Sequence, residues 1–288
     1  MNGLIEQVIK SGAEPKCNVA CPICVRGGKH DRKKALYINR TDGYYRCFRC
    51  GIHGSFGDRA PSDIWLHDSG KIVTPSANEI PLPEEFVTYD WLQNCNDKSI
   101  QATKRLALDY AHKRAITRDI AEQYGIGFCI RGPKAGRIIV PITEGPYATK
   151  TYGYVARDYT GWSDYPYLYP KGMSRGITFF NSSALYEDTD TPLLVMEGVL
   201  DCLPHLPNAV AVLGMPSHTQ LQQLTQCVRP VVFALDGDAW QQAEMLSWQL
   251  RFLGCTSGYI KLKPKQDPDE ISKEALLQMA TASMCAGV

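Results

Sequence analysis

An apolar run ends in a carboxylate at Leu193-Leu194-Val195-Met196-Glu197-Gly198-Val199-Leu200-Asp201. Its first four residues predict a buried strand, and the glycine after Glu197 allows a tight strand-to-helix turn or the close approach of a ligand. A helix over residues 199–206 would bring Asp201 back over the same edge. Because ligand sites in α/β sheets form at the carboxyl ends of the strands, Glu197 and Asp201 are candidate site residues.

Two more apolar runs end in acidic residues. Phe233-Ala234-Leu235 leads into Asp236-Gly237-Asp238, and Ile260-Lys261-Leu262 leads into the stretch Gln266-Asp267-Pro268-Asp269-Glu270. Alternate residues of an extended segment point the same way, so Asp236 and Asp238 can face one ion. Each acid alone could be a helix cap or a turn residue. Three strand ends that each supply carboxylates instead favour a hard-oxygen site for magnesium or manganese.

This arrangement suits nucleotidyl transfer. The reaction must neutralise charge on an attacking 3′ hydroxyl, on the phosphorus oxygens and on the departing pyrophosphate, and two divalent cations about 4 Å apart do so. The candidate catalytic residues are Glu197, Asp236 and Asp238, and the candidate ligands of the cations are Glu197, Asp201, Asp236, Asp238, Asp267 and Asp269.

The surrounding pattern predicts the fold class. One further apolar run lies at residues 209–213, and the two runs just described extend over 231–235 and 258–262; these runs alternate with helical patterns at 221–226 and 241–253. Continuous apolar strands that alternate with helices imply a parallel sheet covered on both faces, and so an α/β fold. Upstream, residues 98–130 have helical periodicity, and short strands follow at 138–142 and 152–155.

A separate cysteine motif lies near the N-terminus. Cys21-Pro22-Ile23-Cys24 and Cys47-Phe48-Arg49-Cys50 are two Cys-x-x-Cys knuckles separated by 22 residues. Paired knuckles predict one tetrahedral zinc ion with the ligands Cys21, Cys24, Cys47 and Cys50. The segments 36–38 and 44–46 alternate like a β-hairpin that brings the knuckles together, with a turn at 41–43. Cys17 or His53 could replace one of the four ligands.

Four thiolates leave no open position on zinc, so we expect the ion to be structural and the surface of this module to carry its function. Residues 16–59 have a local net charge of +7, against −6 for the rest of the chain. This asymmetry indicates a nucleic-acid partner, although a basic surface can simply be solvated. The candidate contacts are basic (Arg26, Lys29, Arg32, Lys33, Lys34), for phosphates, or aromatic (Tyr44, Tyr45, Phe48), for unpaired bases.

Targeting and ATPase signals are missing from the sequence. The N-terminus has no signal-peptide apolar region, and no apolar run approaches the roughly 20 residues that span a bilayer. We therefore expect a soluble protein of the cytoplasm with no membrane partner. The sequence has no Gly-x-x-x-x-Gly-Lys-Ser/Thr stretch, so we expect neither a P-loop ATPase nor an attached helicase.

Together these motifs resemble the DnaG-like bacterial and phage DNA primases, over most of the chain. Residues 21–58 are similar to that family's zinc-binding domain, and residues 104–128 are similar to its small helical segment. Arg137 to Ile142 and Tyr152 to Arg157 resemble the first part of its polymerase core. The motifs Glu197-Gly198…Asp201, Asp236-Gly237-Asp238 and Asp267-Pro268-Asp269-Glu270 match its Toprim catalytic pattern.

The resemblance implies a function. A member of this family makes short RNA primers on single-stranded DNA from ribonucleoside triphosphates, with one zinc ion and two or more magnesium or manganese ions. It also works beside a replicative helicase, here a separate protein, in the bacterial host cytoplasm if a phage encodes it. Glu197 would help to deprotonate the attacking hydroxyl. Arg137 would handle template or nucleotide phosphates, and Lys171 or Arg175 would replace a family lysine that is displaced here.

The resemblance also implies a domain organisation with a Toprim-type parallel sheet as its core. We expect a zinc-ribbon template-binding domain at 1–60, a proline-rich linker at 61–97, a helical and β subdomain at 98–190, the Toprim subdomain at 191–270 and a C-terminal helix or tail at 271–288. The alternatives are a recombination-mediator-like protein and a non-catalytic zinc/Toprim DNA-binding protein.

Overall fold

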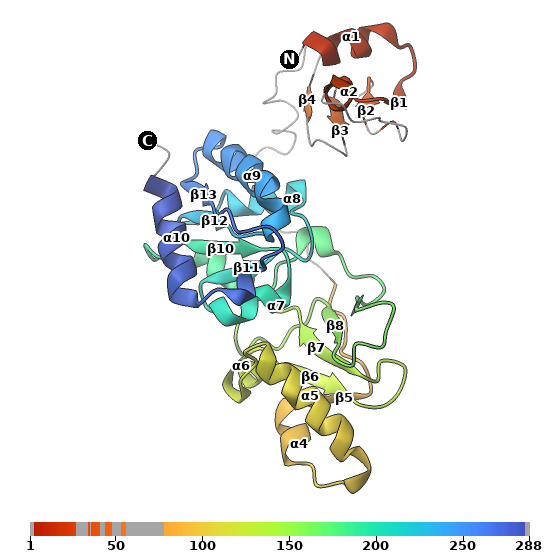
Figure 1. Ribbon diagram of the computed structural model, residues 1–288, viewed down its shortest axis with the longest axis vertical. Helices are drawn as coiled ribbons and strands as arrows, with labels where there is room; N and C mark the ends of the chain where they lie inside the picture. The colour runs from red at the N-terminus through yellow and green to blue at the C-terminus, as the bar shows by residue number, and fades with distance from the viewer. Residues whose placement is uncertain are drawn as a thin grey trace. The chain divides into compact units, whose positions relative to one another are not determined.

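The computed structural model describes residues 3–26, 34, 36–40, 44–47, 53–55 and 78–285. The chain divides into two compact units, Met1–Thr74 and Pro75–Val288, whose elements are labelled in Figure 1. Within the described ranges, no helix combines the length and the apolar character needed to cross a membrane.

The described residues of the first unit form a small antiparallel sheet and two helices. Its strands are paired in the order β1-β2-β3-β4. The elements are α1 (Gly3–Ser11), β1 (Lys16–Val19), α2 (Pro22–Arg26), β2 (Leu36–Asn39), β3 (Tyr44–Cys47) and β4 (His53–Ser55). Tyr37 lies opposite Arg46 and Ile38 opposite Tyr45, so the expected hairpin between the knuckles is confirmed. Its turn, residues 41–43, lies outside the described residues.

Among the described residues of this unit, the buried core is small and contains the cysteines. Cys21 and Cys47 are fully buried and Cys24 is 3% exposed, and they pack with apolar side chains of α1, β2 and β3 (Ile5, Ile9, Leu36, Ile38, Tyr45). A core of this size stabilises a fold only marginally. A metal bound by the cysteines would therefore contribute much of the stability of the unit.

The second unit begins with an antiparallel sheet in the order β5-β6-β7-β8-β9. Its strands are β5 (Phe86–Thr88), β6 (Gly127–Cys129), β7 (Arg137–Pro141), β8 (Tyr154–Asp158) and β9 (Tyr167–Leu168), and its helices are α4 (Tyr89–Asn94), α5 (Gln101–Lys113) and α6 (Arg118–Gln123). Threonine N-caps begin two of the helices, because Thr88 accepts from the backbone of Trp91 and Thr117 from that of Ile120. Because β5 lies within residues 61–97, part of the expected linker belongs to this sheet.

A four-stranded parallel sheet follows, in the order β11-β10-β12-β13. Its strands are β10 (Leu193–Met196), β11 (Ala209–Ala211), β12 (Val231–Phe233) and β13 (Ser257–Tyr259). All three pairings are parallel, which confirms the expected α/β sheet. β10 has the predicted bounds, while β11, β12 and β13 are shorter than the apolar runs that predicted them. Ile260 and Leu262 are buried beyond the end of β13.

Helices cover both faces of this sheet, as Figure 1 shows for α9 and α10. Alternate strand residues separate into two cores, one with α7 (Val199–Cys202) and α10 (Lys273–Cys285), the other with α8 (His218–Leu224) and α9 (Trp240–Phe252). The predicted helix over 199–206 is instead α7 followed by the 3-10 turn η4 (Leu203–His205). Pro204 has no N–H group, so the α-helical hydrogen bonding cannot continue there.

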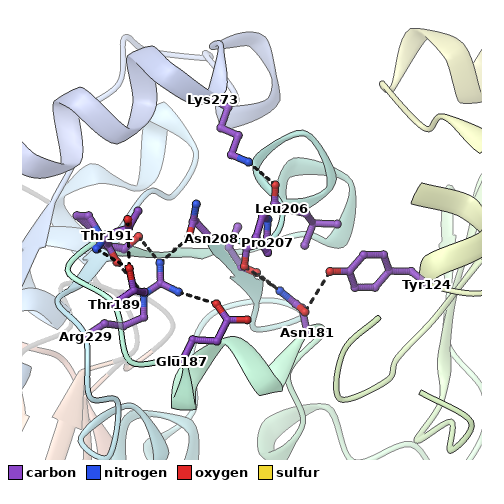
Figure 2. Close-up of polar contacts among 12 residues, drawn as sticks. Tyr124, Asn181, Glu187, Thr189, Thr191, Leu206, Pro207, Asn208, Arg229 and Lys273 are labelled. Atoms are coloured by element: carbon purple, nitrogen blue, oxygen red, sulfur yellow. Dashed lines mark hydrogen bonds and ion pairs between the residues drawn. The ribbon is translucent and has the colours of Figure 1, made fainter. Parts of the chain in front are cut away.

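Two buried polar side chains, Asn181 and Arg229, form hydrogen bonds with several loops of the second unit, as Figure 2 shows. Asn181, in the left-handed region with φ 61°, donates to the carbonyls of Pro207 at 3.2 Å and Ala209 at 2.9 Å. It accepts from the Tyr124 hydroxyl at 3.2 Å. The buried Arg229 guanidinium donates to Thr191, Pro192, Asn208 and Glu187. These bonds satisfy polar groups that burial would otherwise leave unpaired.

Candidate carboxylate and cysteine sites

Glu197 and Asp236 lie at the carboxyl edge of the parallel sheet. Glu197 directly follows β10, and Asp236 follows β12, the neighbouring strand. The sheet order reverses between these two strands, since β11 lies on the other side of β10. Such a switch point is where ligands bind in open α/β sheets. Burial raises the pKa of Glu197, and the negative charge of Asp236 raises it further, so the two carboxylates interact.

Close contact between two loops brings the third acidic motif to Asp236. The Gly237 amide donates to the Gln266 carbonyl at 2.9 Å, and a Cβ at Gly237 would lie 1.8 Å from the Lys263 carbonyl oxygen. Only glycine therefore fits between the carboxylates of the Asp236-Gly237-Asp238 motif. Burial raises the pKa of Asp236, and the charges of Asp267, Asp269 and Asp238 raise it further.

Asp201 faces the same group of acids from α7. Burial raises its pKa to about 7, together with the charges of Asp236, Asp269 and Asp267. Gly198 makes room for this side chain, because a Cβ there would lie 2.5 Å from Asp201 Oδ2. All six predicted carboxylates thus belong to one edge of the sheet. Asp238 is exposed, and the other five are half-buried.

Two residues that the motifs did not indicate position the third acidic loop. Asp269 lies in the 3-10 turn η6 (Pro268–Glu270) and pairs with Arg114. The fully buried His205 contacts the Pro268 carbonyl through Nε2 at 3.0 Å, and burial lowers its pKa. A neutral imidazole that donates from Nε2 fits this contact. Neither residue has a local sequence signal, because both partners are distant in the chain.

The carboxylates fit a divalent cation in their chemistry. Asp236 Oδ1 is buried and has no hydrogen-bond partner among the described residues, which is the situation of an oxygen that awaits a ligand. All the side chains offer oxygen, which magnesium and manganese prefer. In the described part of the chain, no three carboxylates lie within 4.8 Å of one another. Like charges without a cation between them repel.

The cysteine site is already close to the geometry of a bound zinc ion. The Sγ atoms of Cys21, Cys24 and Cys47 all lie within 4.8 Å of one another, and those of Cys24 and Cys47 are 3.8 Å apart. Zn–S bonds of about 2.3 Å place tetrahedral ligands about 3.8 Å apart. The three-cysteine cluster is therefore compatible with a zinc site. The predicted fourth ligand, Cys50, lies outside the described residues.

The two alternative zinc ligands differ in what the structure shows. Cys17 Sγ accepts from the Arg40 guanidinium at 3.1 Å and does not belong to the three-sulfur cluster. The same guanidinium donates to the carbonyls of Ile9 and Glu14, so Arg40 connects Cys17 to the α1 end of the unit. His53 begins β4, and its side chain is not among those described.

The predicted phosphate-binding residues lie in different environments. Arg137 is 7% exposed, and its guanidinium donates to Ala156, Ser163 and Tyr165. It thereby holds the loop between β8 and β9. Lys171 and Arg175 are exposed, and the Arg175 guanidinium lies 4.5 Å from the centre of the Tyr169 ring. Lys34 is exposed. Arg26 ends α2 with its side chain undescribed, and Lys33 lies outside the described residues.

Comparison with known proteins identifies the fold. No protein-family model and no curated protein matches the chain. The zinc-binding and RNA polymerase domains of Aquifex aeolicus primase match with a TM-score of 0.52 at 19% identity, over 97% of this chain and 83% of that chain. A DnaG catalytic core matches with 0.51 at 19% identity, over 68% and 78% of the two chains.

A third solved structure agrees with these two. The RNA polymerase domain of Mycobacterium tuberculosis primase DnaG has a TM-score of 0.50 at 17% identity, over 64% of this chain and 78% of that chain. The fold is therefore α/β, with a Toprim-type parallel sheet as its core and a small N-terminal β domain that carries a three-cysteine cluster. More particularly, it is similar to that of the DnaG primases, as the motifs predicted.

Proposed function

We propose that this chain is a DNA primase that joins ribonucleotides on a single-stranded DNA template. One observation carries the proposal: carboxylates that follow three neighbouring parallel strands interact at the switch point of the sheet. The similarity to DnaG primase cores supports the same function at the level of the fold.

The carboxylates would hold two or more magnesium or manganese ions. We assign six residues as ligands of these ions, of which Glu197, Asp236 and Asp238 are also the catalytic residues; the other three are Asp201, Asp267 and Asp269. The ions supply the positive charge that the attacking oxygen, the α-phosphate and the leaving pyrophosphate require. The Glu197 carboxylate would also accept the proton of the 3′ hydroxyl as the new phosphodiester bond forms.

The remaining predicted residues would handle nucleic acid. Lys171 and Arg175 are exposed cations for template or nucleotide phosphates, and Arg137 acts through the loop that it holds. In the zinc module, Arg26, Lys33 and Lys34 would bind the template backbone. The zinc ion would have a structural role. A separate replicative helicase in the same cytoplasm would supply single-stranded template.

A primer-synthesis assay tests the proposal. Wild-type protein with single-stranded DNA, Mg²⁺ and labelled ribonucleoside triphosphates is expected to produce short oligoribonucleotides. Changing Asp236 and Asp238 together to Ala removes two ligands and is expected to lower synthesis at least about 10³-fold, since metal-ion catalysis contributes several kcal/mol.

A matched control accompanies this double variant. Asp188 is exposed and precedes β10, at the opposite edge of the sheet, so Asp188→Ala is expected to leave synthesis unchanged. Zinc content, measured by atomic spectroscopy, is expected to be the same in all three proteins. Undiminished synthesis by the double variant would refute the site. A wild-type protein that binds single-stranded DNA but never makes oligomers would favour the non-catalytic alternative.

A further inference from the structure

The ion pair between Arg114 and Asp269 joins the helical part of the second unit to the carboxylate site. Arg114 follows directly after α5, and its partner lies 155 residues further along the chain. Both side chains are largely covered, at 29% and 13% exposure. Ion pairs with exposed partners contribute little, whereas the geometry of a covered pair is held by its surroundings.

The surroundings of Arg114 keep its charge close to the acids. Burial lowers the pKa of the Arg114 guanidinium, but its interactions with the Asp269 carboxylate and two tyrosines raise it by more, so the guanidinium stays charged. The two tyrosines are Tyr110 and Tyr167. The Tyr110 hydroxyl in turn accepts from Arg157 at 3.1 Å, and the Arg157 guanidinium lies 4.4 Å from the centre of the Tyr167 ring. This layer of aromatic and guanidinium groups lies beside Arg114. The carboxyl end of α5, which carries partial negative charge, also favours a cation at this position.

Arg114 interacts with more than one carboxylate. Its positive charge lowers the pKa of Asp201, which burial and the neighbouring acids raise. The ion pair uses Asp269 Oδ2, so the other oxygen of that carboxylate stays outside the pair. A protein cation fixed here and a mobile divalent cation attract the same carboxylates and repel each other.

Building on the carboxylate site proposed above, we propose that Arg114 is a built-in counter-charge, a positioning residue that holds Asp269 by one oxygen and weakens the binding of divalent cations. It limits the negative charge that accumulates at the sheet edge when no cation is bound. It also keeps the affinity low enough for ions to enter and leave with the nucleotide and the pyrophosphate. The site then has a graded response to cation concentration and does not trap a permanently bound ion.

The sign of the effect makes the proposal testable. In nucleotide-free and DNA-free protein at constant ionic strength, Mn²⁺ binding can be measured by electron paramagnetic resonance. Arg114→Met and Arg114→Gln remove the charge and are expected to lower the Kd of Mn²⁺ at least about fivefold, the lower limit of typical coupling between two sites in a protein. Arg114→Lys keeps the charge and is expected to retain the wild-type Kd.

A residue that merely supported the fold would give the opposite result, since its loss would weaken cation binding. Arg118→Met is the matched control. Arg118 begins α6 and pairs with Asp90 on the surface, at 60% and 54% exposure. The Arg118→Met variant is expected to bind Mn²⁺ with the wild-type Kd.

The proposal is overturned if both Arg114→Met and Arg114→Gln bind Mn²⁺ as wild type does or more weakly. It is also overturned if Arg114→Lys tightens binding as much as they do. Because this measurement needs no primer synthesis, its outcome is separate from that of the primase assay.

Discussion

The cysteine cluster and the carboxylate site differ in how closely the folded chain gathers its ligand atoms. Three sulfur atoms already lie within 4.8 Å of one another, while the carboxylates share an edge without forming such a group. A neutral thiol packs like a small apolar side chain, so cysteines can be buried together before an ion arrives. Carboxylates that are buried together repel each other, and their pKa values rise instead. The chemistry of the ligands thus accounts for the difference in their spacing.

The two units also differ in what stabilises them. In its described residues, the first has few buried apolar side chains and places its cysteines among them. The second has extensive apolar layers on both faces of its parallel sheet, and one of these layers continues into the helical segment. We therefore expect the first unit to depend on zinc for its fold, and the second to fold without a cation and to use cations for chemistry.

Removal of zinc should show this difference most strongly. A strong chelator, or Cys24→Ser, is expected to unfold the first unit, because a structural zinc ion contributes on the order of 10 kcal/mol to folding. Hydrogen exchange followed by mass spectrometry can monitor each unit separately. Peptides from residues 3–47 should lose protection, while those from the parallel sheet should keep it.

Cys17→Ser is the matched control for this experiment. Cys17 lies beside the cluster but accepts from Arg40, so its replacement should keep the zinc and cost about 1 kcal/mol, the contribution of one hydrogen bond. Equal loss of zinc in Cys17→Ser and Cys24→Ser would contradict the assigned ligand set. Protection of the first unit in zinc-free protein would remove the contrast between the units.

Much of the fold was predictable because its signals are local. The apolar runs that end in Glu197 and Asp236 identify two strands, and the alternation of such runs with helices predicts a parallel sheet. Chain order does not make these two strands neighbours, because β11 lies between them in the sequence but on the other side of β10 in the sheet. The spacing of the knuckles likewise identifies the cysteine cluster. Contacts made by single side chains across long distances in the chain have no such signal. The pairing of Arg114 with Asp269, the contact of His205 with Pro268 and the burial of Arg137 depend on how sheets and loops pack.

Asn181 offers a second, smaller test of what holds the second unit. Its amide donates to two carbonyls, and its backbone has φ 61°, as Figure 2 illustrates. Asn181→Ala removes these bonds and strains the backbone. It is expected to lower the free energy of unfolding by about 2–3 kcal/mol, with or without a chelator. Urea unfolding followed by circular dichroism measures the change.

Two further variants separate the causes of this loss. Asn181→Gly relieves the backbone strain but lacks the amide, so it should lose slightly less stability than Asn181→Ala. Asn94, whose side chain bonds to Asp90 at the protein surface, is the matched control, and Asn94→Ala should cost less than about 0.5 kcal/mol. A chelator-dependent loss in Asn181→Ala would show that the second unit also relies on a tightly bound metal.

The smallest effect concerns the pH dependence of the carboxylate site. Burial and the neighbouring acids raise the pKa of Asp201 to about 7. The cation-free folded protein therefore keeps a proton that the unfolded chain releases near pH 4. The free energy of unfolding then falls as the pH rises from about 4 to 7, because the folded state binds more protons than the unfolded state in this range.

Asp201→Asn removes this contribution of Asp201, while the raised pKa values of Glu197 and Asp236 leave a weaker dependence in the same direction. Without divalent cations, the variant should match wild type at pH 4 and be more stable by about 1–2 kcal/mol at pH 8, a discounted part of the full linkage. Thermal unfolding should show a midpoint a few degrees higher.

Added Mg²⁺ at pH 8 should stabilise wild type more than the variant, since it binds the ionised carboxylates. Asp188→Asn, at an exposed position, should show neither effect. If Asp201→Asn is no more stable than wild type at pH 8, the chain itself offsets the charge of the Asp201 carboxylate in the wild-type protein. Repulsion among the carboxylates would then not distinguish this site from the cysteine cluster.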